Sequence, residues 1–222
     1  GNWDNTTDSE VKYDHAMLFT RHDLFQFFFG FNDITGLSLP ERVCERGFRV
    51  SVVEAGDYFK MTTTAAHELG HNLGAVHDGE GKAAHCKSED LFIMNSNNIE
   101  FDPKQPYSGN PWIFSTCSVE AFKETLRNKD CVINKGVLFN TYEWMKYVKK
   151  MPGKVYHPNE QCELINGPGS KLCTDVSPHI CRFMNCTDPK SNECLPKYFS
   201  AARGTTCGKN MWCMQGQCVP EA

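Results

Sequence analysis

The twelve cysteines of this 222-residue chain are unevenly distributed, and their distribution constrains the fold more than any other feature. Residues 1–131 contain four cysteines, whereas the 57 residues from Cys162 to Cys218 contain eight. A segment so small, and so rich in Gly, Pro and Asn, cannot depend on an apolar core and is typical of a disulfide-bonded scaffold. The sequence therefore predicts one domain with an apolar core followed by a compact disulfide-rich module.

An even number of cysteines also indicates an oxidising, extracellular compartment. The alternative is a set of structural zinc sites, suggested by the short spacings from Cys181 to Cys186 and from Cys213 to Cys218. Structural zinc sites commonly contain a C-x-x-C pair, and the sequence has none. Disulfide bonds are therefore the favoured interpretation.

Composition and charge argue against several classes of function. Apolar residues make up 40% of the chain, and a net charge of −4 with dispersed signs gives no reason to expect nucleic acid or an anionic membrane as partner. No apolar run approaches the roughly 20 residues that span a bilayer. Two N-x-[ST] sequons make Asn5 and Asn185 candidate glycosylation sites, so a glycoprotein is expected.

Residues 67–78 carry the chemistry and are His-Glu-Leu-Gly-His-Asn-Leu-Gly-Ala-Val-His-Asp. On a helix, His67 and His71 lie one turn apart on the same face, where two imidazole nitrogens can bind one zinc ion. Gly74 stands where the helix must end, and a left-handed conformation there lets His77 fold back as a third ligand. Three neutral histidines leave one position on zinc for water, which is typical of a catalytic site.

Glu68 lies between two of these ligands and is the candidate general base. Zinc bound to three neutral imidazoles lowers the pKa of bound water toward about 7 and polarises a peptide carbonyl. Glu68 would accept the proton of this water and return it to the leaving amine. The sequence thus predicts a zinc-dependent endopeptidase with one catalytic Zn²⁺.

The first region is predicted to be α/β. His15–Thr20 and Phe48–Glu54 are rich in strand-forming residues, and Ile34–Leu39 is a shorter candidate edge strand. We expect the helix that carries the histidines to begin between residues 57 and 64. A last helix is expected over Ser118–Arg127, with its first serine as the N-cap.

Three segments follow from these patterns: a protease domain over residues 1–134, a linker over 135–155, and a cysteine-rich module over 156–222. Apolar residues recur at helical spacing within the linker, at Leu138, Tyr142, Met145 and Val148. We interpret this pattern as a helix docked on the protease domain, and a surface that contacts substrate is the alternative.

The motif and its surroundings resemble the adamalysin (reprolysin) family of metzincin zinc metalloproteases, and most of all its ADAMTS branch. Asp78, directly after the third histidine, is that family's variant of the motif, and Tyr13–Leu24 is similar to the strand segment ahead of its active-site helix. The disintegrin-like module of the same branch resembles Pro152–Tyr156, Gln161–Leu164, Gly167–Ser170, Gly204–Gly208 and Trp212–Cys213. The resemblance implies an α/β (α+β) metzincin protease domain followed by a disintegrin-like, cysteine-rich module.

The resemblance also implies support for the metal site. Met94, seventeen residues after the third histidine, fits the family's Met turn, which forms the floor beneath the metal by steric contact. Gly74 and Asp78 are expected to support the same site.

Calcium is a further expectation of the resemblance, near Asp130, Cys131 and Asn134. Asn134 stands where the family usually has aspartate, which weakens a calcium site.

The cysteine pairing cannot be derived from the sequence alone, because eight cysteines already allow 105 connectivities. The resemblance to the ADAMTS branch implies six pairs: Cys44–Cys131, Cys86–Cys117, Cys162–Cys186, Cys173–Cys194, Cys181–Cys213 and Cys207–Cys218.

The family implies a secreted, extracellular enzyme that acts on matrix or plasma proteins. Arthropod venom and salivary proteases combine the same parts, so a toxin is one hypothesis. The absence of an Arg-Gly-Asp triplet disfavours integrin binding of that type. Only 66 residues precede His67, fewer than in a family protease domain, so we expect an N-terminally incomplete domain. The alternative function is a non-enzymatic, disulfide-rich binding protein that retains a truncated protease scaffold.

Overall fold

The computed structural model of the chain describes residues 13–26, 31–55, 60–96, 110–133 and 150–221. The chain divides into two compact units: residues 1–98 with 113–137, and residues 99–112 with 138–222. Among the described helices, none is both long enough and apolar enough to cross a membrane.

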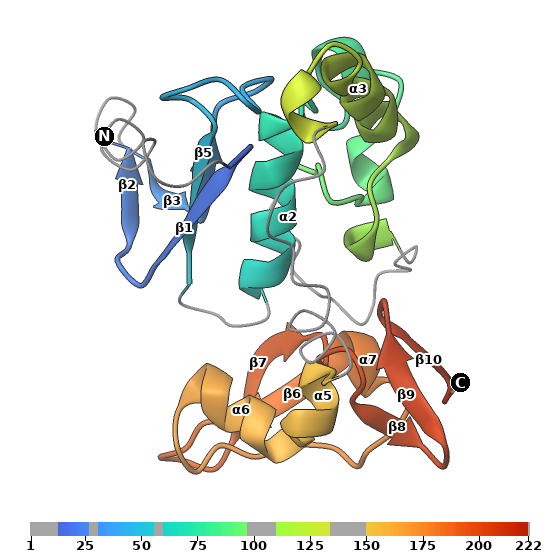
Figure 1. The fold of residues 1–222 in the computed structure, drawn as a ribbon. Helices are drawn as coiled ribbons and strands as arrows, with labels where there is room; N and C mark the ends of the chain where they lie inside the picture. Colours follow the sequence, from blue (N-terminus) through green and yellow to red (C-terminus); the bar gives the residue numbers. More distant parts are fainter. Residues whose placement is uncertain (1–12, 27–30, 56–59, 97–109, 134–149, 222) are drawn as a thin grey trace. The chain divides into compact units, whose positions relative to one another are not determined.

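A three-stranded sheet forms one layer of the first unit (Figure 1). Strand β5 (Val50–Glu54) lies in the centre, parallel to β1 (Ala16–Thr20) and antiparallel to β4 (Gly36–Ser38). The predicted strands at His15–Thr20 and Phe48–Glu54 are therefore present in shortened form. Strand β4 lies at the edge of the described part of this sheet, and the sequence predicted an edge strand over Ile34–Leu39, a range that includes β4.

The predicted strand over Ile34–Leu39 is divided between two structures. Its first residue ends β3 (Phe31–Ile34), which pairs with β2 (Leu24–Gln26) in a separate two-stranded sheet. Only residues 36–38 form β4. This hairpin was not predicted from the sequence.

Helix α2 (Lys60–Asn72) packs against the sheet and carries the first part of the histidine motif (Figure 1). Its start falls within the predicted range of residues 57–64. Val53 of β5 is fully buried in this unit, and Gly74, with φ of +105°, follows the last turn of α2. The positive φ at Gly74 agrees with the left-handed helix end expected from the sequence.

Helix α3 (Thr116–Leu126) begins earlier than predicted. Its N-cap is Ser115, whose side chain accepts a hydrogen bond from the Ser118 backbone N–H, so the predicted N-cap at Ser118 is wrong. Both serines fit the capping preference, and the buried face of the helix does not distinguish between them. Short 3₁₀ helices complete the described part of residues 81–132: η1 (Gly81–Ala83), η2 (Ser88–Asp90), η3 (Asn110–Trp112) and η4 (Asp130–Val132).

The second unit is built from short helices and small antiparallel sheets. Its helices are α5 (Pro152–Val155), α6 (Pro158–Asn166) and α7 (Ile180–Phe183). Strands β6 (Met184–Thr187) and β7 (Cys194–Phe199) pair with each other, and β9 (Met211–Met214) lies between β8 (Thr206–Gly208) and β10 (Gln217–Pro220).

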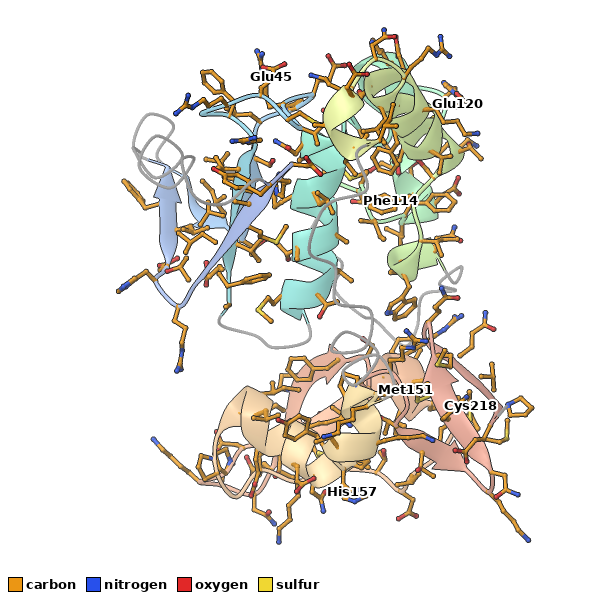
Figure 2. All side chains as sticks on the ribbon, in the orientation of Figure 1. Glu45, Phe114, Glu120, Met151, His157 and Cys218 are labelled. Atoms are coloured by element: carbon orange, nitrogen blue, oxygen red, sulfur yellow. A yellow bond between two sulfur atoms is a disulfide. The ribbon has the colours of Figure 1, made fainter. Side chains whose placement is uncertain are left out.

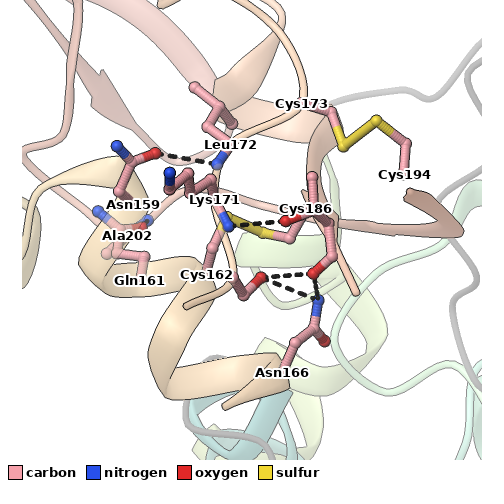
Figure 3. The surroundings of a disulfide bond; sticks show 12 residues. Asn159, Gln161, Cys162, Asn166, Lys171, Leu172, Cys173, Cys186, Cys194 and Ala202 are labelled. Atoms are coloured by element: carbon pink, nitrogen blue, oxygen red, sulfur yellow. Dashed lines mark hydrogen bonds between the residues drawn. A yellow bond between two sulfur atoms is a disulfide. The ribbon is translucent and has the colours of Figure 1, made fainter. Parts of the chain in front are cut away.

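Disulfide sulfurs form much of the core of the second unit. Among the described residues, the main cluster of buried apolar side chains in this unit has nine members, and five of them are cysteines: Cys162, Cys181, Cys186, Cys207 and Cys213. Figure 3 shows Cys162 of α6 bonded to Cys186 of β6, with hydrogen bonds from Asn166 and Lys171 beside it. The core thus agrees with the expectation that this segment depends on disulfides rather than on apolar side chains.

All twelve cysteines are paired, and the pairs are the same six that the family resemblance implied. The two pairs of the first unit join positions 44 to 131 and 86 to 117. The four other pairs lie within residues 162–218. Disulfides and not structural zinc sites therefore account for the cysteines.

Several predictions concern residues outside the described ranges. They are the glycosylation candidate Asn5, the calcium candidate Asn134, and the linker pattern at Leu138, Tyr142, Met145 and Val148.

Candidate functional site

The three histidines of the motif converge although they come from two different local structures. His67 and His71 lie one turn apart on α2, and the turn at Gly74 brings His77 back beside them. The Nε2 atom of His77 lies 3.2 Å from Nε2 of His67 and 3.2 Å from Nε2 of His71. A Cβ atom at Gly74 would lie 2.0 Å from Thr125 Oγ1, so glycine is required here for space as well as for conformation.

Polar contacts at the opposite ring nitrogens orient the imidazoles: hydrogen bonds for His67 and His71, and a longer contact with a carboxylate for His77. His67 Nδ1 donates to the Ile93 carbonyl at 2.7 Å, and His71 Nδ1 donates to the Ala75 carbonyl at 2.8 Å. His77 Nδ1 faces a carboxylate oxygen of Glu80 at 3.5 Å. Because these oxygens can only accept, each Nδ1 carries the proton, and the three Nε2 atoms present lone pairs to one point.

Three lone pairs directed at one another repel unless a cation lies between them, and the spacing fits zinc. Two nitrogens bound tetrahedrally to zinc at about 2.05 Å are about 3.3 Å apart, close to the distances found here. Burial lowers the pKa of His67 to about 4 and also lowers that of His71, so both rings are neutral at neutral pH, which is the form that can bind zinc.

Within the described ranges, every other group of possible metal ligands depends on cysteines that are disulfide-bonded. None of these groups contains Asp130, so the calcium expectation gains no support there.

Glu68 lies beside the histidines and is almost completely buried. Burial raises the pKa of its carboxyl group to about 7. Gly36 of β4 lies against this side chain, because an added Cβ atom there would lie 2.6 Å from both Cγ and Oε1 of Glu68. The absence of a side chain at Gly36 therefore creates the space that the carboxyl group occupies. Sequence reasoning did not identify this glycine, because only the sheet register brings it to the helix.

Met94 lies directly against α2 at Gly70, a residue that stands between the two candidate ligands of that helix in the sequence. It is fully buried, and a Cβ atom at Gly70 would lie 2.5 Å from its sulfur. Phe114, labelled in Figure 2, contacts the same glycine and packs edge-to-face against Phe122 of α3. The Met94 carbonyl accepts a hydrogen bond from the Asp78 N–H at 2.9 Å, which ties this segment to the end of the motif.

Asp78 connects the motif to α3. Its carboxylate is buried and accepts a hydrogen bond from Ser115 Oγ at 2.6 Å, while the same hydroxyl caps the helix. Burial raises the pKa of Asp78 above its ordinary value, and the Ser115 hydrogen bond opposes this shift. Ser115 was not predicted as part of the site.

Asn185, the glycosylation candidate that lies within the described residues, is part of β6. Its Oδ1 atom is buried and forms no hydrogen bond within the described residues.

Comparison with known proteins agrees with this geometry. Residues 2–136 match the sequence model described as Reprolysin (M12B) family zinc metalloprotease, and residues 152–219 match that of the ADAMTS cysteine-rich domain 2. The chain is 32% identical over 213 residues to "A disintegrin and metalloproteinase with thrombospondin motifs 18" of Mus musculus, covering 94% of this chain and 16% of that protein. It is 34% identical over 219 residues to "A disintegrin and metalloproteinase with thrombospondin motifs 7" of Rattus norvegicus, covering 96% of this chain and 13% of that protein.

The fold and the three-histidine site are those of a zinc metalloprotease domain joined to a cysteine-rich domain. The chain belongs to the reprolysin (M12B) family of zinc metalloproteases. It spans about one-sixth or less of the length of the curated relatives named above.

Proposed function

We propose that this chain acts as a secreted zinc-dependent endopeptidase on extracellular proteins. The observation that carries the proposal is the convergence of three Nε2 lone pairs, from His67, His71 and His77, beside the buried carboxyl group of Glu68. Zinc bound by these three residues would act as a Lewis acid toward a peptide carbonyl and toward water.

The side chains of the site then have separate tasks. The histidines hold the cation, and their Nδ1 hydrogen bonds keep the rings oriented. A carboxylate oxygen of Glu68 accepts a proton from the attacking water and returns it to the nitrogen of the leaving amine. A carboxyl group whose pKa burial has raised to about 7 can both accept and release a proton near neutral pH.

The edge strand supports an extended polypeptide as the substrate. Strand β4 pairs with β5 on one side and forms the edge of the described sheet on the other. Its Gly36 contacts the Glu68 side chain, while Leu37 and the following Leu39 are exposed. An extended chain that pairs with β4 would therefore place a peptide bond beside the base.

The substitution Glu68→Gln tests this proposal. It removes the base but leaves all three ligands, so zinc binding should persist while peptide cleavage falls by about 10²- to 10⁴-fold. Zinc is measured by mass spectrometry of the purified chain, and cleavage by hydrolysis of a denatured protein. Near-normal cleavage by a zinc-loaded Glu68→Gln variant would overturn the assigned role.

Several finer points belong to the same proposal. They are the secreted location, matrix or plasma substrates, the disintegrin-like character of the module, and the division at residues 134 and 155. The names of the relatives above do not refer to venom or saliva, so a toxin role rests on the resemblance alone. No observation favours the non-enzymatic alternative over the peptidase.

A further inference from the structure

A buried polar cluster connects the end of α2 to the sheet. His15, just before β1, contacts Asn72, the last residue of α2, and Ser51 of β5. Asn72 is fully buried and directly follows the ligand His71. The sequence pattern predicted only a strand that begins at His15, because these contacts join residues 57 and 36 positions apart.

The hydrogen-bond directions within this cluster are fixed by its neighbours. The Asn72 amide donates from Nδ2 to the carbonyls of Leu39, at 3.1 Å, and Phe48, at 3.3 Å, so its Oδ1 atom must face His15. His15 Nδ1 therefore donates to Asn72 Oδ1 at 2.8 Å, and His15 Nε2 accepts from the Ser51 hydroxyl at 2.9 Å. Burial lowers the pKa of His15, which favours the neutral ring that this arrangement needs.

The main chain holds the same turn of helix from a second direction. The carbonyls of His71 and Asn72 accept hydrogen bonds from the N–H groups of Glu41, at 3.0 Å, and Val43, at 3.1 Å. These bonds hold the helix end from the side of residues 41–43, and the His15–Asn72 hydrogen bond holds the same turn from the sheet. Rotation of that turn would displace His71 Nε2, which must stay 3.2 Å from His77 Nε2.

We propose that His15 is a positioning residue of the metal centre: its hydrogen bond to Asn72 fixes the rotation of the last turn of α2 and thereby increases the affinity of His71 and its partners for zinc. The inference rests on the proposed zinc site but goes beyond it, because His15 contacts no ligand. Loss of a partner that is hydrogen-bonded directly to a ligand typically weakens metal binding by about 10- to 100-fold, and we expect the lower end of this range for His15, which acts through Asn72.

Two amide variants separate this role from general stability. In His15→Asn the amide nitrogen takes the place of Nδ1 and can still donate to Asn72, whereas in His15→Gln it takes the place of Nε2 and cannot. The zinc dissociation constant of the whole chain is measured by competition with a chelator of known affinity. We expect His15→Gln to bind zinc about 10-fold more weakly than the wild type, and His15→Asn to stay within about 3-fold of it.

Two further variants serve as controls. Ser51→Ala removes the hydrogen bond on the side away from the helix, and His22→Ala removes an exposed histidine of the same unit. Both should bind zinc within about 3-fold of the wild type. Melting temperatures with and without zinc give a second readout: a merely structural role lowers both values equally, whereas positioning reduces the gain that zinc provides.

The outcomes separate the two proposals. A wild-type chain that binds no zinc would overturn the proposed function itself. If the wild type binds zinc and both variants, His15→Gln and His15→Asn, bind it as tightly as the wild type, only the role of His15 is overturned. The same conclusion follows if the two variants lose zinc affinity to the same extent.

Discussion

Replacement of Gly36 by alanine tests whether the edge strand sets the position of the general base. The new methyl group would lie 2.6 Å from Cγ and Oε1 of Glu68 and 2.8 Å from Cδ, whereas ordinary contact begins at 3.4 Å. The carboxyl group must therefore move by about 0.8 Å. A displacement near 1 Å of a catalytic group can cost about 100-fold in rate, so we expect kcat/KM to fall about 100-fold, or about 2.7 kcal/mol.

The fold should tolerate this change. Alanine is favoured over glycine within a strand by about 0.5–1 kcal/mol, which offsets part of the local crowding. Hydrolysis of a quenched fluorescent peptide measures kcat/KM, and urea titration measures the free energy of unfolding. Gly208→Ala is the matched control, because it adds the same methyl group to strand β8 at an ordinary distance of 3.5 Å from Met211.

Two results would refute this reasoning. One is a zinc-loaded Gly36→Ala variant with wild-type kcat/KM, which would mean that Glu68 either adapts without loss or is not the base. The other is a loss of activity that merely follows a loss of zinc, which would place the effect on the ligands instead.

Three other perturbations have defined outcomes. Gly70→Ala would place a Cβ atom 2.5 Å from the Met94 sulfur, and such overpacking should destabilise the chain by about 1–3 kcal/mol in urea titration. Ser115→Ala removes a helix cap and the hydrogen bond to buried Asp78, so it should cost about 3 kcal/mol by the same measurement, and an unchanged midpoint would contradict it. Burial lowers the pKa of His15 below 6.5, so the unfolded chain binds a proton at this position more readily than the folded chain does. The free energy of unfolding should therefore decrease as pH falls below 6.5. Urea titrations of the chelator-treated chain at two pH values should therefore show a smaller acid loss in His15→Asn than in the wild type.

Local spacing predicted those parts of the site that lie close together in sequence. Two histidines four residues apart must share a helix face, and a glycine three residues later allows the reversal that brings back the third. The start of α2 and two strands of the sheet were predicted for the same reason, because each depends on a short pattern. The cysteine pairs could be predicted only through the family resemblance, since spacing alone leaves the connectivity open.

The parts that sequence did not predict all depend on contacts between distant segments. Gly36 meets Glu68, and Ser115 meets Asp78, only after the sheet and α3 have packed around α2. His15 and Asn72 are 57 positions apart. The start of α3 was misplaced because two serines three residues apart both fit an N-cap, and only the contact of Ser115 with Asp78 distinguishes them.

The carbonyl oxygens that orient His67 and His71 belong to the main chain at positions 93 and 75. Every amino acid carries such an oxygen, so no substitution at these two positions can delete the acceptor itself. The acceptors therefore survive any substitution, and the limits on these positions come from packing and from the path of the backbone, as at Gly74. Random mutagenesis with selection for zinc retention should consequently recover several different residues at the half-buried position 93, only small residues at the buried position 75, and only glycine at 74.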